Sequence, residues 1–204
     1  MITFDAFMPL VLPYATACPE PLAEASIRNS AIEFCERTRC WRLLDDTVID
    51  ADTPDVIAVS TPAGSALHRI ETAWFDGRKI DPASFASVPQ DDDDQRGSPR
   101  TYSQSNFGEL RLFPRPDAGK LRLSLFLKPD RASDEVPDFL HQQFGQEIAY
   151  GALVQILLTP SQPFSDPQMA AYYKSRFDAA CDKNFAISIT GQQRARPRTR
   201  ASFV

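Results

Sequence analysis

Apolar residues recur at three- and four-residue steps near the N-terminus and in the last third of the chain, and this spacing predicts helices. The first long helix is predicted from about Pro19 to Trp41, because proline is tolerated in an opening turn. A shorter helix is predicted before it, from about Thr3 to Leu10. The apolar face of the long helix carries Ile27, Ala31, Phe34, Thr38 and Trp41.

The last third of the chain contains two periodic segments. One predicted helix spans residues 134–158, and the next begins at Ser165–Pro167, where capping residues precede proline. Because a short proline-rich turn joins them, the two helices are predicted to form an antiparallel pair. Gly151 lies inside the first of them and costs about 1 kcal/mol relative to alanine, which predicts that another element packs closely against it.

Alternating apolar and polar residues between these helical parts predict strands. The alternation is clearest at Leu110–Leu112 and Leu121–Leu125, with Pro114–Gly119 as the hairpin connection and Asp76–Gly77 as a second turn. The acidic run Asp91–Asp94 is too charged to pack and predicts an exposed loop. The predicted strands cover residues 55–60, 67–74, 108–113 and 120–127.

These elements predict an α+β fold, with helical parts at residues 1–45 and 134–190 and a β-rich region at residues 46–133 between them. Residues 1–190 are predicted to make a single domain, followed by an extended basic C-terminal arm at residues 191–204.

Composition narrows the classes of function. The four cysteines lack the two-residue spacing of zinc or thioredoxin-like sites, so we expect reduced, structural thiols. The longest apolar stretch, Ile148–Leu158, is too short to cross a membrane. Without the four arginines of the arm, the chain has 18 basic and 27 acidic residues, so the rest of the chain carries a net charge of −9. This acidic body argues against nucleic-acid binding by the globule itself.

Few residues are candidates for chemistry. His68 is predicted in a strand and His141 in a helix, and neither has a nucleophile or metal ligand paired with it in the sequence, so a structural or surface role is expected. Asp91–Asp94 could bind a divalent cation, but four adjacent aspartates repel one another and favour a solvated loop. The sequence has no Gly-rich phosphate loop, nucleophile elbow or helical metal pair. It therefore predicts no catalytic, cofactor-binding or metal site, and a protein that is not an enzyme.

The C-terminal arm has two interpretations. It is either a solvated tail, or a segment that binds a partner through its arginines and its apolar end. Contact of the arginines with DNA phosphates is a weaker alternative, because four charges give only modest, salt-sensitive affinity. The candidate binding residues are Arg194, Arg196, Arg198, Arg200, Phe203 and Val204.

The order of three sequence blocks along the chain is more informative than any one block alone. The blocks are Phe4–Pro9 with Cys18–Leu22 and Ala31–Thr38; Phe75–Arg78 with Leu110–Pro116; and Pro137–Leu140, Ile148–Leu153 and Ala170–Phe177. In this order the blocks resemble the opening helix, the β-rich insertion and the C-terminal helical hairpin of phage head-to-tail adaptor proteins, the connector or tail-tubular-like family. The resemblance covers about residues 2–185 and consists of packing patterns.

The resemblance implies a helical core, made of the N-terminal helix and the C-terminal antiparallel helix pair, with residues 46–133 as a β-rich insertion. It also implies a structural virion protein of the neck, assembled in the cytoplasm of a bacterial host. It implies a ring, usually of twelve copies, that lies between the portal and the tail or nozzle proteins and extends the DNA channel. DNA would pass without sequence-specific binding, no membrane would be involved, and the C-terminal arm would reach the portal. Two alternatives remain: another neck or tail-completion protein, such as a tail terminator, and a small soluble ligand-binding α+β domain.

Overall fold

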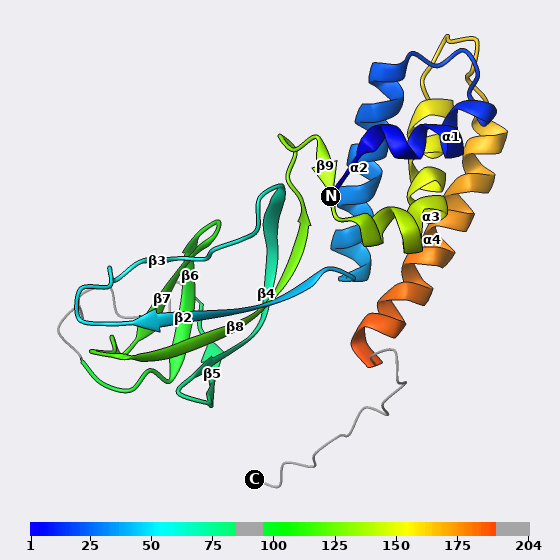
Figure 1. Cartoon of the computed structure of the whole chain (residues 1–204). Coiled ribbons are helices and arrows are strands. Elements are labelled where there is room, and N and C mark those ends of the chain that lie inside the picture. The colour runs from blue at the N-terminus through cyan, green and yellow to red at the C-terminus, as the bar shows by residue number, and fades with distance from the viewer. Residues whose placement is uncertain (85–95, 191–204) are drawn as a thin grey trace, which may run out of the picture. The chain divides into compact units, whose positions relative to one another are not determined.

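The computed structural model describes residues 1–84 and 96–190, and the chain divides into two compact units. The helical unit combines Met1–Cys40 with the described part of Lys128–Val204, and the sheet unit is Trp41–Leu127. Figure 1 shows the helices gathered in the first unit and the seven-stranded sheet in the second. Over the described ranges, no helix has the length and apolar character that a membrane crossing requires.

The described residues of the helical unit form four α-helices, two short 3-10 helices and a two-stranded ladder. β1 pairs with β9, which ties the N-terminus to the start of α3. α2 follows Pro19 and ends where Arg39 adopts a left-handed conformation and donates its backbone N–H to the carbonyl oxygen of Cys35. The elements are β1 (Ile2–Thr3), η1 (Phe4–Phe7), α1 (Met8–Val11), η2 (Leu12–Tyr14), α2 (Glu20–Thr38), β9 (Glu135–Val136), α3 (Asp138–Leu157) and α4 (Pro167–Thr190).

α3 is the central helix of this unit, because it packs against both α2 and α4. At Gly151 the three helices are too close for any side chain: an added Cβ would overlap the Ser30 hydroxyl of α2 and come within 2.8 Å of the Phe177 ring of α4. Ser30 is completely buried there and donates a hydrogen bond of 2.6 Å to the carbonyl oxygen of Ile148. The predicted close packing at Gly151 is therefore confirmed.

We predict that Gly151→Ala destabilises the helical unit although alanine is the better helix former. The overlap forces α2 or α4 to move, which costs about 1–3 kcal/mol and outweighs the gain of about 1 kcal/mol in helix propensity. Thermal unfolding followed by far-ultraviolet circular dichroism measures the loss.

Gly145→Ala in the same helix is the matched control. Its added Cβ would meet the flexible end of Leu10 at 3.3 Å and the His141 ring at an ordinary contact distance of 3.6 Å, so this variant should unfold at or above the wild-type temperature. Equal destabilisation by both substitutions would contradict the account of Gly151.

The described strands of the sheet unit form one seven-stranded sheet in the order β2-β8-β4-β5-β6-β7-β3. β5 and β6 run parallel, whereas β2–β8, β4–β5, β6–β7 and β3–β7 are antiparallel. The predicted turn at Asp76–Gly77 joins β4 to β5. The last two residues of β8 fall in the helical unit. The strands are β2 (Arg42–Ile49), β3 (Ile57–Ala58), β4 (Ser65–Phe75), β5 (Arg78–Pro82), β6 (Thr101–Asn106), β7 (Glu109–Phe113) and β8 (Gly119–Pro129).

The predicted fold class, a helical core with a β-rich insertion, is wrong. The protein is α+β, but the strands form a curled sheet with its own hydrophobic core, so the helices are not the core of the chain. Apolar side chains of the strands bury one another and need no helix to cover them. The buried residues of this core are Ile49, Ile57, Leu67, Ile70, Ala73, Phe75, Ile80, Tyr102, Leu110, Leu112, Leu121, Leu123, Leu125 and Leu127. The assignment of residues 1–190 to a single domain stays a prediction.

Candidate functional site

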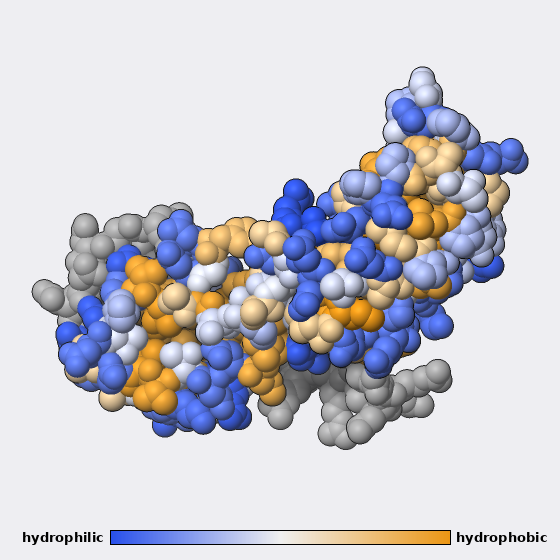
Figure 2. Space-filling view, turned by 45° about the horizontal axis from the view of Figure 1, so that its top comes forward, coloured by the Kyte–Doolittle hydropathy of each residue, from blue (hydrophilic) through white to orange (hydrophobic). Residues whose placement is uncertain are grey.

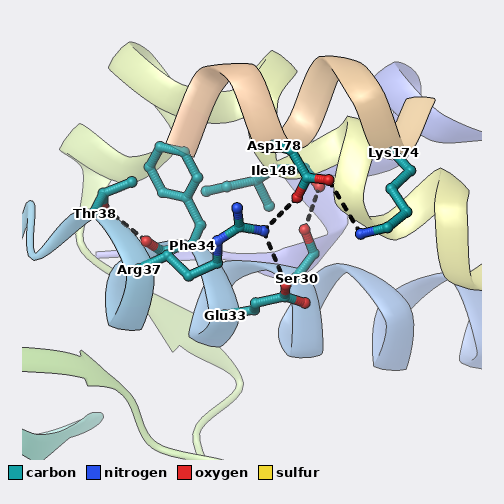
Figure 3. Close-up of polar contacts among 8 residues, drawn as sticks. All are labelled: Ser30, Glu33, Phe34, Arg37, Thr38, Ile148, Lys174 and Asp178. Atoms are coloured by element: carbon teal, nitrogen blue, oxygen red, sulfur yellow. Dashed lines mark hydrogen bonds and ion pairs between the residues drawn. The ribbon is translucent and has the colours of Figure 1, made fainter. Parts of the chain in front are cut away.

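A polar network holds α2 to α4 on the surface of the helical unit (Figure 3). Arg37 of α2 donates a hydrogen bond of 2.6 Å from Nη1 to Oδ1 of Asp178 on α4. The same guanidinium lies 3.4 Å from Glu33, and Lys174 lies 3.1 Å from the second oxygen of Asp178. The arginine also covers the ring of Phe177, at 5.5 Å from the centroid. One arginine thus links two helices and covers the aromatic ring that contacts Gly151.

Arg37 also sets the ionisation of this network. Its hydrogen bond holds the pKa of Asp178 below the ordinary value, with a further contribution from Lys174, while partial burial opposes the shift. The pKa of Arg37 is raised in turn by Asp178. Both side chains are about one-third exposed, so solvent screens the pair and its contribution to stability is about 0.5–1 kcal/mol.

We predict that Arg37→Gln lowers the free energy of unfolding by about 0.5–1 kcal/mol near neutral pH. A carboxyl whose folded pKa is depressed contributes stability above its unfolded pKa and loses it as pH falls through the folded pKa. The difference between variant and wild type should therefore shrink in acid. Urea titrations at a series of pH values measure it.

Lys174→Gln is the control. It removes another partner of the Asp178 carboxylate, and this partner is mostly exposed. Its effect should be smaller than that of Arg37→Gln at neutral pH. A difference that persists unchanged below the pKa of Asp178 would show that the arginine acts through packing alone.

The sheet unit carries the first candidate interaction surface, on strand β2. Leu44 and Val48 point outward from this strand and are 63% and 74% exposed. A groove of about 680 Å³ is lined by Leu44 with Trp74 of β4 and Lys120 and Arg122 of β8. Figure 2 shows hydrophobic surface among hydrophilic surface on the face of the sheet unit that it draws. We call Leu44, Val48 and Trp74 the β2 surface.

A fixed charge lies between the two exposed apolar residues of β2. Asp46 accepts hydrogen bonds of 2.6 and 2.9 Å from Nε and Nη2 of Arg122, and the ammonium of Lys120 lies 3.2 Å away. These partners, Arg122 foremost, lower the pKa of Asp46 to about 2, so the carboxylate stays ionised at neutral pH. Exposed apolar side chains beside arginine and tryptophan are typical of protein–protein interfaces.

The helical unit carries a second candidate surface, made of tyrosines. The ring of Tyr173 lies 6.0 Å from Tyr14, 5.8 Å from Tyr150 and 5.4 Å from Tyr172. Tyr14 and Tyr172 are 57% and 49% exposed, and Arg176 donates a hydrogen bond of 3.1 Å to the hydroxyl of Tyr172. Tyrosine and arginine are enriched among the residues that dominate binding energy at interfaces. This tyrosine surface is chemically unlike the β2 surface.

The two histidines lie in different units. His141 donates from Nε2 to the carbonyl oxygen of Ala6, 3.2 Å away, and packs edge-on against Phe7, whereas His68 lies half-buried in β4. Asp91–Asp94 and the arm residues Arg194 to Val204 lie outside the described residues. Over the parts of the chain that are described, no three His, Cys, Asp or Glu side chains gather as a metal site would require.

All four cysteines are free thiols in the structure, as expected. Cys18, Cys35 and Cys181 are buried, and Cys40 is half-buried. Burial raises the pKa of Cys181 to about 12, so this thiol stays protonated and unreactive at neutral pH.

Sequence reasoning missed both surfaces. On β2, Leu44 and Val48 are separated by acidic residues, and so few apolar positions do not stand out as a strand. At the tyrosine surface a signal was available: Tyr173 belongs to the buried face of α4, so the adjacent Tyr172 has to point elsewhere.

Comparison with known families defines the class of protein. A family model described as SU10 adaptor protein matches residues 14–201, which is most of the chain. The protein is therefore a phage adaptor, a structural component of a virus particle that interacts with other head or tail proteins. More narrowly, the chain belongs to the SU10 adaptor protein family, which confirms the predicted head-to-tail adaptor family. No curated protein matches the chain.

Proposed function

We propose that this protein is the head-to-tail adaptor of its phage, and that its copies form a ring between the portal and the tail and extend the DNA channel. The family match over residues 14–201 carries the proposal. Membership in an adaptor family implies a structural role and not an enzymatic one. Portal and tail or nozzle proteins are the proposed partners, and DNA passes without sequence-specific contacts.

The surfaces of the molecule support assembly into a ring. A closed ring repeats one head-to-tail interface, so every copy has to present two different, complementary patches. The β2 surface, with its aliphatic residues and fixed Asp46–Arg122 pair, and the tyrosine surface are two such chemically distinct patches. The residues of these two surfaces that are more than one-third exposed, Leu44, Val48, Tyr14 and Tyr172, are available to a partner.

We predict that the purified protein binds the isolated portal of its phage and forms rings of twelve copies stacked on it. Cryo-electron microscopy of the mixture reports both the copy number and the side of the portal that is bound. The purified tail tube, mixed in the same way, is the comparison that separates an adaptor from a tail terminator. If the protein binds the end of the tail tube and does not bind the portal, it is a tail terminator and not a head-to-tail adaptor.

The C-terminal arm is the proposed portal-binding segment of the ring. Four arginines and no acid lie within residues 191–204, which end on Phe203–Val204. Arginine pairs strongly with carboxylates, and the two apolar residues supply an anchor. The family match continues to residue 201 and so includes all four arginines.

We predict that deletion of residues 191–204 leaves the fold intact and removes most of the affinity for the portal. Circular dichroism and thermal unfolding check the fold, and biolayer interferometry on immobilised portal checks binding. A full-length chain with Arg131→Gln and Lys183→Gln, two exposed cations outside the arm, is the control for a general charge effect. Unchanged affinity after the deletion would show that the arm does not bind the portal, and it would not contradict the adaptor assignment.

A further inference from the structure

Strand β2 is an open edge of the sheet. It pairs with β8 in an unbroken antiparallel register of eight residues, from Arg42 opposite Phe126 to Ile49 opposite Gly119. β2 is the terminal strand in the sheet order, and no backbone group in the described residues bonds to its other side. This leaves a row of N–H and C=O groups that a further strand can pair with.

β2 has few of the devices that normally protect such an edge. Edge strands are usually kept from pairing by shortness, bulges, proline or charged side chains, lysine above all. The other edge of the sheet follows this rule, because β3 has only two residues. β2 has eight residues, no proline, no lysine and no bulge, and it exposes Leu44 and Val48, so charge is its only protection. An edge protected by acidic side chains stays open to a strand of opposite charge.

The charge on β2 and the turn after it indicates what that partner carries. Residues 42–55 contain five aspartates and one arginine. Asp46 is paired with Arg122, and Asp55 with Arg111. The other three are Asp45, Asp50 and Asp52, which form no ion pair with any residue in the described ranges. The edge therefore fits a basic strand.

The C-terminal arm has the sequence of such a strand. From Arg194 to Arg200 every second residue is arginine, so an extended chain places all four arginines on one face. The alternating stretch Arg194–Ala201 has eight residues, the length of β2. Pro197 interrupts it, and proline is tolerated in an added edge strand where its missing N–H faces away from the sheet.

We propose that the β2 edge of one copy binds the stretch Arg194–Ala201 from a second copy as an added strand, before the portal takes up the arm. Backbone hydrogen bonds supply affinity and the arginine–aspartate pairs supply selectivity. A link from the arm of one copy to β2 of another is a head-to-tail contact of the kind that a ring repeats. The added strand also places its own side chains beside Leu44 and Val48 and presents Pro197 outward, which prevents further growth of the sheet.

This inference rests on the proposed function in one respect: the portal is the competing partner. An arm held on β2 is unavailable to the portal, so the apparent portal affinity falls by the fraction of arms that are free. Substitutions on β2 should therefore loosen the contact between copies and tighten binding to the portal.

The test compares the full-length chain with the variant Leu44→Lys/Val48→Lys, which blocks the edge at two exposed positions that the fold tolerates. Amide hydrogen exchange at high protein concentration should protect both residues 42–49 and 194–201 in the wild type. The protection should be at least about tenfold weaker in the variant and after dilution. Affinity of the variant for the portal should rise about threefold or more. Phe107→Lys/Leu158→Lys, at two exposed apolar positions outside β2, is the matched control and should behave as the wild type.

Equal exchange of the arm in wild type and variant would overturn the inference. Protection that does not change on dilution would also overturn it, because the arm would then bind to its own chain and not to a second copy. These exchange results do not depend on the portal. If no form of the protein binds the portal, the proposed function fails even where the exchange pattern supports the contact between copies.

Discussion

The closeness of α2 and α4 to α3 at Gly151 is the constraint on which the helical unit depends. A glycine is required because Ser30 and Phe177 occupy the space where any side chain would lie. Ser30 can lie there only because it is small and donates to the carbonyl oxygen of Ile148, so a polar atom is buried without losing its partner. Arg37 then closes the open side of the same contact by covering Phe177 and binding Asp178. The three helices thus meet around one glycine, and the ion pair adds to a contact that packing has already fixed.

The sheet unit is packed differently from the helical unit, because its strands bury one another's apolar side chains. β8 supplies Leu121, Leu123, Leu125 and Leu127, all essentially inaccessible, and it lies between β2 and β4. The sequence alternation identified this strand and β7 correctly, because buried leucines alternate with less buried residues in β7 and in the first half of β8. It could not identify what covers the buried face. A period of two reports that one face is buried and says nothing about its partner, so it did not reveal that the sheet has its own core in place of a helical one.

Helices were predicted more closely than strands for a related reason. α2, α3 and α4 have periodic apolar faces and proline at or near their first turns, and their observed starts at Glu20, Asp138 and Pro167 lie within a few residues of the predictions. β6 escapes prediction because its sequence is polar, with Tyr102 and Ser103 buried. β2 escapes because Asp45 and Asp46 interrupt it and half of its apolar residues face outward. Exposed apolar residues such as Leu44 and Val48 obey no rule of burial within one chain, so the pattern of a single sequence conceals a surface of this kind.

The acidic character of β2 also explains how an open edge can exist on a protein made in many copies. Two β2 edges paired antiparallel about the middle of the strand would place Asp45 and Asp46 of one copy beside Asp46 and Asp45 of the other, and like charges in close apposition destabilise a pairing. A basic strand meets no such penalty. Charge therefore separates the unwanted symmetric pairing from a contact with a different segment, and it does so without the prolines or bulges that would close the edge to every partner. In the proposed ring, where copies join in one direction, this selectivity matters more than additional stability.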